Sequence, residues 1–236
     1  MFYTPYPAQA MMDFRPEHLH YSTETLSGIT IPCPVNDIDV DSLRQCWRAL
    51  DEALRQHPLR MMVPVILHHS GNKQHQWHSC YPTSYLPTPR PNYEQVHPRL
   101  QAFFGNLNHR LVHYFHPKRR RRFDKHPYHA LSQPLGNEAT LVVFFFHGSN
   151  YRALGRATGN ERHLQTQLRL AWLDTLGVQV HQFSDSSLWI NVKNDLRVNL
   201  NSANSIYQPQ YDAMRSQLAW FAHRSLPTSS VVHWRF

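Results

Sequence analysis

Six consecutive apolar residues, Leu141 to Phe146, form a continuous run that is rich in β-branched and aromatic side chains. The run is too short to span a membrane and has no alternating polar face. It therefore predicts a central β-strand that is buried on both sides. The residues His147 to Asn150 then supply turn chemistry. We expect an amphipathic helix after this turn, with apolar positions at Leu164, Leu168, Ala171, Trp172 and Leu176.

Apolar residues spaced three to four positions apart predict three further helices. The first is capped by one of three nearby aspartates and ends near His57 and Pro58. The candidate caps are Asp37, Asp39 and Asp41, and the apolar positions are Val40, Leu43, Trp47, Leu50 and Leu54. The second helix covers residues 96–115, with its buried face at Leu100, Phe103, Phe104, Leu107, Leu111 and Phe115. The third runs from about Gln210 to Arg224, with inward positions at Tyr211, Met214, Leu218 and Phe221.

Shorter apolar segments predict the remaining strands. Residues 59–69 form one strand, in which Pro64 removes a ladder hydrogen bond and favours an edge position or a bulge. A final strand is expected over residues 231–236. Before it, an antiparallel meander is predicted from segments 178–183, 188–192 and 196–200. These elements together predict an α+β fold with a central antiparallel sheet flanked by helices.

The chain has 236 residues, which suits one substantial core. Residues 1–35 are rich in Pro, Thr and Ser and predict an extended N-terminal arm. Residues 36–236 then form a single α+β domain, in which the proline-rich stretch 80–98 is an irregular loop. No secretory signal or membrane-spanning segment is evident, so we expect a cytoplasmic protein with no membrane partner. The three cysteines include no closely spaced pair, which argues against a disulfide framework.

The charge balance points to polyanions as partners. The chain carries 24 Lys and Arg against 16 Asp and Glu, a formal net charge of +8. In a cytoplasmic protein such a field favours nucleic acid, with an affinity that falls as salt rises. The alternative is that the charge serves solubility alone.

The strongest local charge signal is the run Lys118 to Arg122, followed by Lys125. Only one acid, Asp124, lies nearby, so these cations cannot all form ion pairs within the chain. Arginine presents forked donors suited to phosphate oxygens, and the neighbouring aromatic residues are suited to stacking on bases. The predicted nucleic-acid-binding residues are Lys118, Arg119, Arg120, Arg121, Arg122 and Lys125, with Arg152 and Arg156 from the turn after the central strand. The alternative is a solvated loop.

Three segments of the chain resemble one protein family. The segments are FFFHGSNYRALG, AWLDTLG and QYDAMRSQLAWFAHRS. They resemble the replication initiators of filamentous phages and related prophages, which look like members of the HUH endonucleases. The resemblance covers about residues 59–226. It implies an HUH/RRM-like sheet and a DNA-binding role in the replication of a mobile genetic element.

The chain departs from that family at the catalytic positions. DNA nicking in the family needs a metal held by paired histidines and a tyrosine nucleophile. The histidine pair would precede the apolar strand, but the chain has Glu138, Ala139, Thr140 and Leu141 there. The nucleophile's position in the family's late Tyr-Leu-Ala-Lys motif is held by Trp220. The resemblance therefore implies a nucleic-acid-binding protein that lacks nicking activity, with no catalytic residue and no cofactor assigned.

Two alternatives remain open. The first is an active nickase with Mg²⁺ or Mn²⁺, in which His18 and His20, or His68 and His69, replace the ligands and Tyr207 and Tyr211 act as nucleophiles. Against it, Pro209 disfavours a continuous helix through both tyrosines, which otherwise are one core aromatic and one helix-entry residue. The second is an RNA-binding or RNA-processing subunit of a ribonucleoprotein, which needs no metal. Single-stranded or structured DNA is the favoured partner, with RNA and a larger protein complex as further possibilities.

Overall fold

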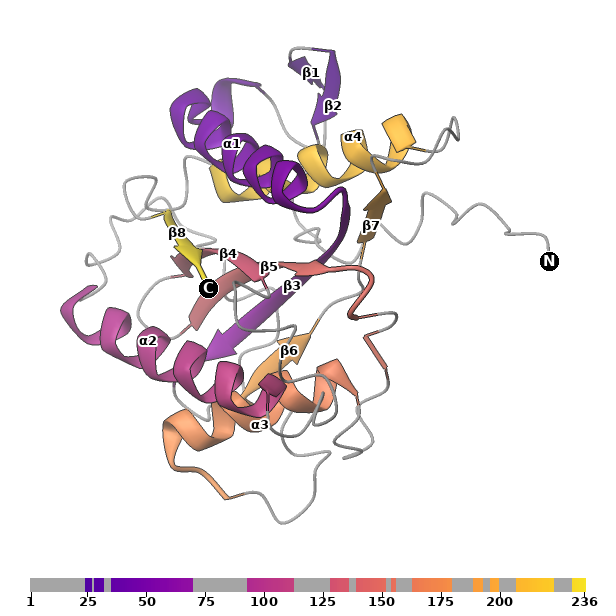
Figure 1. The fold of residues 1–236 in the computed structure, drawn as a ribbon. Helices are drawn as coiled ribbons and strands as arrows, with labels where there is room; N and C mark the ends of the chain where they lie inside the picture. The colour runs from indigo at the N-terminus through magenta and orange to yellow at the C-terminus, as the bar shows by residue number, and fades with distance from the viewer. Residues whose placement is uncertain are drawn as a thin grey trace.

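The computed structural model describes residues 24–26, 28–31, 35–69, 93–112, 128–135, 139–151, 154–155, 163–179, 189–192, 196–199, 207–222 and 231–236. Two helices cover each face of the main β-sheet, so that the described residues form three layers (Figure 1). The α+β class and the helix-flanked antiparallel sheet predicted from sequence are therefore confirmed.

The helices lie close to their predicted positions. They are α1 (Val40–Gln56), α2 (Tyr93–Arg110), α3 (Leu164–Leu176) and α4 (Tyr207–Leu218), and α4 continues as a 3₁₀ turn, η7 (Ala219–Ala222). Gly177 ends α3 in the left-handed conformation, with φ of 64°, which favours glycine at a helix C-terminus. Pro98 lies inside α2, which begins before the predicted residue 96.

The main sheet has six strands, and all of its pairings are antiparallel. The strands are β3 (Leu59–His68), β4 (Tyr128–Leu135), β5 (Ala139–His147), β6 (Ile190–Val192), β7 (Leu196–Asn199) and β8 (Val232–Arg235). Strand β5 contains the apolar run and pairs with β3 on one side and with β4 on the other. Its predicted central position is confirmed.

The strands of the main sheet lie in the order β6-β3-β5-β4-β8, which defines how the helices connect them. The succession β3-α2-β4-β5-α3-β6 is a split βαβ arrangement, in which each helix links two strands that are separated by a third. Both connecting helices pack on the same face of the sheet. The other face is covered by α1 and α4, which precede and follow this unit in the chain.

Alternating residues of the central strands enter two separate cores. On β5, Phe144 and Phe146 pack toward α2 and α3, whereas Val143 and Phe145 pack toward α1 and α4. These four residues are at most 2% exposed. Because successive side chains of a strand point to opposite faces, an uninterrupted apolar run is the pattern that a sheet covered on both faces requires.

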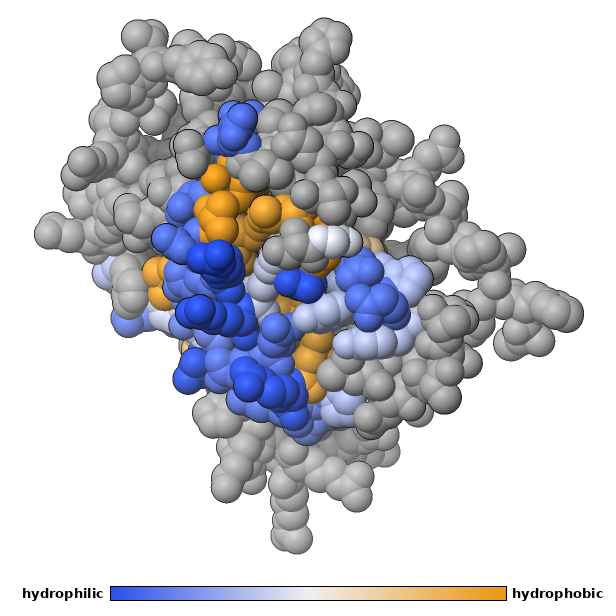
Figure 2. Space-filling model, turned by 90° about the horizontal axis from the view of Figure 1, so that it is seen from above, coloured by the Kyte–Doolittle hydropathy of each residue, from blue (hydrophilic) through white to orange (hydrophobic). Residues whose placement is uncertain are grey.

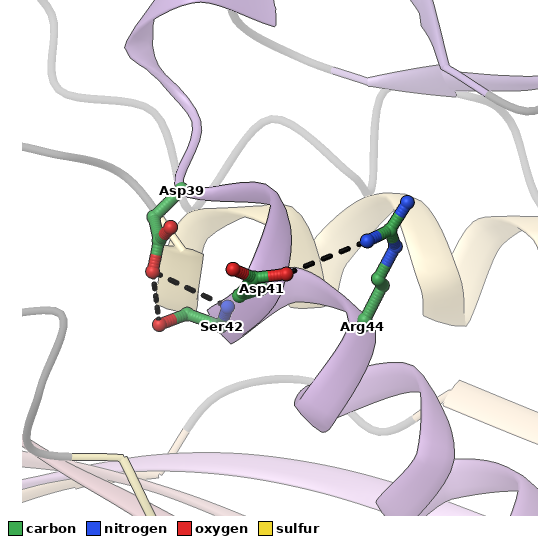
Figure 3. Close-up of polar contacts among 4 residues, drawn as sticks. All are labelled: Asp39, Asp41, Ser42 and Arg44. Atoms are coloured by element: carbon green, nitrogen blue, oxygen red, sulfur yellow. Dashed lines mark hydrogen bonds and ion pairs between the residues drawn. The ribbon is translucent and has the colours of Figure 1, made fainter.

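Asp39 is the aspartate that caps α1. Its carboxylate accepts hydrogen bonds from the backbone nitrogen of Ser42 at 3.2 Å and from the hydroxyl of the same residue (Figure 3). Asp41 instead forms an exposed ion pair with Arg44 at 3.4 Å. The backbone nitrogen of Asp39 also donates to Ala222 O at 2.7 Å, which joins the start of α1 to η7.

The edge position predicted for the strand over residues 59–69 and the meander predicted from segments 188–192 and 196–200 are both wrong. Strand β3 is not at an edge, because it pairs with β5 on one side and with β6 and β7 on the other. Pro64 lies between the part of β3 that pairs with β7 and the part that pairs with β6. A residue without a backbone N–H therefore lies where β3 changes from one partner strand to the next. Strands β6 and β7 do not form a meander, and residues 180–183 of the third predicted segment lie outside the described residues. The two strands pair with successive halves of β3 instead.

The described part of the predicted N-terminal arm contains a small antiparallel pair, β1 (Glu24–Leu26) and β2 (Ile29–Ile31). Ile29 of this pair is buried in the core beneath α1 and α4. Seen from above, the side that carries these two helices in Figure 1 presents hydrophilic side chains around a narrow apolar strip (Figure 2). None of the helices in the described ranges has the length and hydropathy of a membrane span.

Candidate functional site

All eight residues predicted to bind nucleic acid lie outside the described residues, so the structure gives no contacts for them. They are Lys118, Arg119, Arg120, Arg121, Arg122, Lys125, Arg152 and Arg156. The described residues next to these two basic segments are Tyr128, at the start of β4, and Tyr151, after the turn that follows β5. Their rings lie 5.3 and 4.9 Å from the ring of Phe146, centroid to centroid. The two basic segments therefore adjoin the described domain at the same end of the sheet.

The positive charge of the chain is concentrated outside the described residues. The described ranges contain ten arginines and no lysine, set against nine of the 16 carboxylates, a difference of one charge. The remaining segments hold the other 14 cations and seven carboxylates, a difference of seven charges. The described ranges are thus nearly neutral, and seven of the eight net positive charges belong to the remaining segments.

Two histidines meet at this same end of the sheet. His57 ends α1, and His147 ends β5. Their rings are in edge contact, with centroids 4.0 Å apart and planes at 61°. Both side chains are half-buried. In the register of β3 and β5, His147 lies opposite Arg60. We call His57, His147 and Arg60 the sheet-end cluster.

Arg60 is the buried member of the sheet-end cluster, with 0% of its surface exposed. Its Nε donates to Ala53 O at 2.8 Å, near the C-terminus of α1, and its Nη1 donates to Phe145 O at 3.3 Å. Its Nη2 has no hydrogen-bond partner among the described residues. Burial lowers the pKa of Arg60 to about 10, so the guanidinium stays charged at neutral pH. Its partners are carbonyl dipoles, and within the described residues no carboxylate neutralises it.

This buried cation acts on both imidazoles. Burial, the charge of His57 and the charge of Arg60 lower the pKa of His147 to about 4. Burial and Arg60 also lower the pKa of His57 below its usual value. Both rings are therefore neutral at pH 7. The Nδ1 atom of His147 accepts a hydrogen bond from the backbone nitrogen of Ser149 at 3.2 Å, so the neutral ring carries its proton on Nε2.

The histidines proposed as replacement metal ligands have structural partners. His69 Nε2 lies 2.8 Å from Thr140 Oγ1, and its ring contacts the edge of the Trp172 ring with centroids 5.5 Å apart. Trp172 Nε1 donates to His68 O at 3.1 Å. Burial, Arg99 and His68 together lower the pKa of His69 to about 4. These contacts join the far end of β3 to β5 and α3.

The described residues contain no group of three or more His, Cys, Asp or Glu side chains that is able to hold a metal ion. Among these residues, His68 and His69 therefore belong to no such group. The other candidate pair, His18 and His20, lies outside the described residues.

The structure does bring the paired tyrosines together. Helix α4 begins at Tyr207 and includes Pro209 in its first turn, where no backbone donor is needed, so the expected interruption is wrong. The rings of Tyr207 and Tyr211 stack with centroids 5.8 Å apart. The guanidinium of Arg215 lies 5.4 Å from the Tyr211 ring and 3.8 Å from the Trp47 ring. One face of α4 thus carries a stacked series of aromatic and arginine side chains.

The hydroxyl of Tyr211 donates a hydrogen bond to Asp51 Oδ1 at 2.5 Å, across the contact between α4 and α1. Burial and this carboxylate raise the pKa of Tyr211, and burial, Asp51 and Asp212 raise the pKa of Tyr207. Both phenols are therefore protonated at neutral pH. Asp51 is correctly placed to accept a proton from Tyr211, although the same contact also ties the two helices together.

Sequence reasoning did not identify the sheet-end cluster. His57 was recognised only as the end of a helix, and His147 only as the start of a turn. The available signal was their position, since His57 directly follows α1 and His147 ends β5, the strand that pairs with β3. What the sequence alone does not give is the register that places both beside Arg60.

Comparison with known proteins identifies no relative. No family model, no curated protein and no solved structure matches this chain.

Proposed function

We propose that this protein binds nucleic acid through the basic segments that contain Lys118 to Arg122, Lys125, Arg152 and Arg156. In this proposal it serves a mobile genetic element of phage type, as a relative of rolling-circle replication initiators without nicking activity. Its roles include occupying a replication origin, or recognising a nucleic-acid structure as part of a larger complex. The fold alone does not carry this proposal, since split βαβ domains serve many functions.

The observation that carries the proposal is the distribution of charge. The described helices and strands are nearly neutral, and seven of the eight net positive charges belong to the remaining segments. A charge needed only for solubility has no reason to be concentrated in a run such as Lys118 to Arg122. In addition, the described neighbours of the two segments, Tyr128 and Tyr151, both contact Phe146. Two basic segments that adjoin one end of a sheet suit a single polyanion.

The test is a titration of fluorescein-labelled oligonucleotides, followed by anisotropy over a range of salt concentrations. Changing Arg120, Arg121 and Arg122 to Ala should weaken binding of every sequence and reduce the slope of log K against log salt by about 2, at roughly 0.7 per single-strand phosphate contact. The matched control changes three exposed arginines of α1 and α2, namely Arg44, Arg48 and Arg99. An equal loss of affinity in both triple variants would contradict the proposal.

The same titration distinguishes DNA from RNA. We expect oligothymidylate or a DNA hairpin to bind more tightly than RNA of matched sequence. A clear preference for an RNA hairpin would favour the ribonucleoprotein alternative, because discrimination by a single-strand or hairpin reader depends on the 2′-hydroxyl. No binding of either nucleic acid at low salt would refute the proposed function.

The stacked tyrosines support a second candidate, a nickase that uses Tyr207 or Tyr211. The specific observation is the hydrogen bond from the Tyr211 hydroxyl to Asp51, which places a proton acceptor beside the candidate nucleophile. The described residues supply no fitting metal ligands for this reaction.

The nickase candidate predicts a covalent protein–DNA adduct when single-stranded DNA is incubated with the protein and Mg²⁺ or Mn²⁺. The adduct should disappear in the double variant Tyr207→Phe, Tyr211→Phe. Tyr151→Phe is the matched control, because Tyr151 is buried in the opposite core. Absence of an adduct in the unchanged protein leaves nucleic-acid binding as the function.

A further inference from the structure

The sheet-end cluster has the electrostatic character of an anion-binding site. Arg60 is fully buried and charged, and its hydrogen-bond partners are the carbonyls of Ala53 and Phe145. Carbonyl dipoles satisfy hydrogen bonds but leave the net positive charge in place. A buried arginine is ordinarily paired with a carboxylate. Within the described residues Arg60 has none, so its field extends to the half-buried rings of His57 and His147.

The two histidines are the members of the cluster that a ligand can reach. Both are half-buried, whereas Arg60 is closed to solvent. His147 presents an Nε2 hydrogen as a donor, because its Nδ1 is occupied by the backbone nitrogen of Ser149. His57 contacts His147 through its ring, and no hydrogen bond of its side chain is found within the described residues. One face of this corner therefore offers imidazole donors backed by a buried cation.

We propose that His57 and His147 contact a backbone phosphate of bound nucleic acid, and that His57 takes up a proton when this phosphate binds. This inference rests on the proposed function. The ligand is taken to be nucleic acid because the two basic segments adjoin the domain at the same end of the sheet as the cluster. His57 is the proton acceptor because protonating His147 on Nδ1 would bring that hydrogen against the hydrogen of the Ser149 amide.

The proposal predicts the direction of a pH effect. Among the described residues, the charged and titratable groups that act on the two imidazoles are Arg60 of β3 and the imidazoles themselves, at the ends of α1 and β5, and none of these carries a negative charge. A bound phosphate adds a negative charge beside the imidazoles, and this charge raises the pKa of His57. The complex then holds a proton that the free protein lacks, so affinity rises as the pH falls. One proton contributes at most about tenfold in affinity per pH unit.

The first test measures binding of fluorescein-labelled oligothymidylate between about pH 7.5 and pH 5.5, around the ordinary histidine pKa. We expect affinity to rise up to about tenfold toward the lower pH and to become nearly independent of pH in His57→Gln. His147→Asn keeps an acceptor for the Ser149 amide and should lose affinity at every pH, because the Nε2 hydrogen is removed. The matched control is His109→Gln, which changes an exposed histidine on α2 and should keep the pH dependence.

The second test does not need an oligonucleotide. Dimethyl phosphate is a phosphodiester that does not titrate in this range, and its effect on the Cε1–H signals of the histidines can be followed by NMR. We expect it to raise the pKa of His57 and to leave that of His69 unchanged, because His69 lies at the opposite end of β3. A pKa of His57 that does not move, or a pH dependence that survives in His57→Gln, overturns the inference.

The two tests separate this inference from the proposed function. If oligonucleotides bind but neither test implicates His57, nucleic-acid binding stands and the phosphate contact is wrong. If no oligonucleotide binds while dimethyl phosphate raises the pKa of His57, the proposed function fails, and the nucleic-acid ligand assigned to the cluster fails with it.

Discussion

The pKa is lowered for His69 at one end of strand β3 and for His57 and His147 at the other, but these histidines have different surroundings. At one end, His68 and His69 are joined to α3 and β5 by hydrogen bonds and by the ring of Trp172. At the other, His57 and His147, which are half-buried as His69 is, contact each other beside a buried arginine. The same residue type therefore has a structural role at the first end and is available to a ligand at the second. A lowered pKa by itself does not distinguish the two situations.

The largest effect should come from the structural end. Trp172 is completely buried and links α3 to His68, His69 and Phe103. Trp172→Ala should reduce the free energy of unfolding by about 3–5 kcal/mol, measured by urea denaturation. His147→Ala at the opposite end should cost less than about 1 kcal/mol, because a half-buried surface side chain is removed. Equal losses in the two variants would remove the distinction between the two ends.

Arg60 is the next most sensitive position. Arg60→Met keeps much of the side-chain volume but removes two buried hydrogen bonds, so we expect a loss of about 1–3 kcal/mol. Without the cation, the pKa values of His57 and His147 should both rise, and that of His69 should stay unchanged. Histidine Cε1–H titration by NMR measures all three. Arg60→Lys, which restores a charge, should bring the first two pKa values down again.

The acid sensitivity of the fold should come mainly from the structural end. His69 has a pKa of about 4 in the folded protein and about 6.5 when unfolded, so the unfolded chain binds more protons between these values. Stability is therefore complete above about pH 6.5 and declines as the pH falls toward 4. His69→Gln should flatten the dependence of stability on pH by at most about 1.4 kcal/mol per pH unit. His147→Asn should flatten it less, because the His147 ring is less deeply buried than the His69 ring and solvent screens it more.

The smallest effect is expected at His57. Its ring makes no hydrogen bond within the described residues, and the capping contact at this position comes from its backbone nitrogen to Ala53 O at 3.1 Å. His57→Gln should change the free energy of unfolding by less than about 0.5 kcal/mol. A larger loss would mean that the ring is a packing element, and the two ends of β3 would then be alike.

Much of the fold could be predicted because the periodic signals are strong. The helix beginning after Asp39 and the strand over Leu141 to Phe146 were both recognisable from apolar spacing alone. Strand β4 was not predicted, because its sequence includes Ser132, Gln133 and Pro134 although every residue of it is buried. The meander was wrong because short strands 190–192 and 196–199 carry no information about which neighbour they pair with.

The candidate site was less accessible to sequence reasoning. The run Lys118 to Arg122 can be recognised in the sequence from its charge alone. Placing it in the segment between α2 and β4 requires no knowledge of how the strands pair. The sheet-end cluster depends on three residues from different elements, and only the pairing of β3 with β5 brings His147 opposite Arg60. The tyrosine pair was correctly spaced, but its environment depends on Asp51 and Arg215, which sequence reasoning did not link to it.

The position of β5 between β3 and β4 has a consequence for the kinetics of folding. Arg60 and Phe145, which meet across β3 and β5, are 85 residues apart in the chain. Contacts of such long range form slowly, because a large loop must close before they stabilise the chain. Until they form, the side of the segment LVVFFF that pairs with β3 has no partner, and its uncharged, β-prone sequence is of the type that self-associates. Refolding at high protein concentration should therefore lose material to aggregation that dilution recovers.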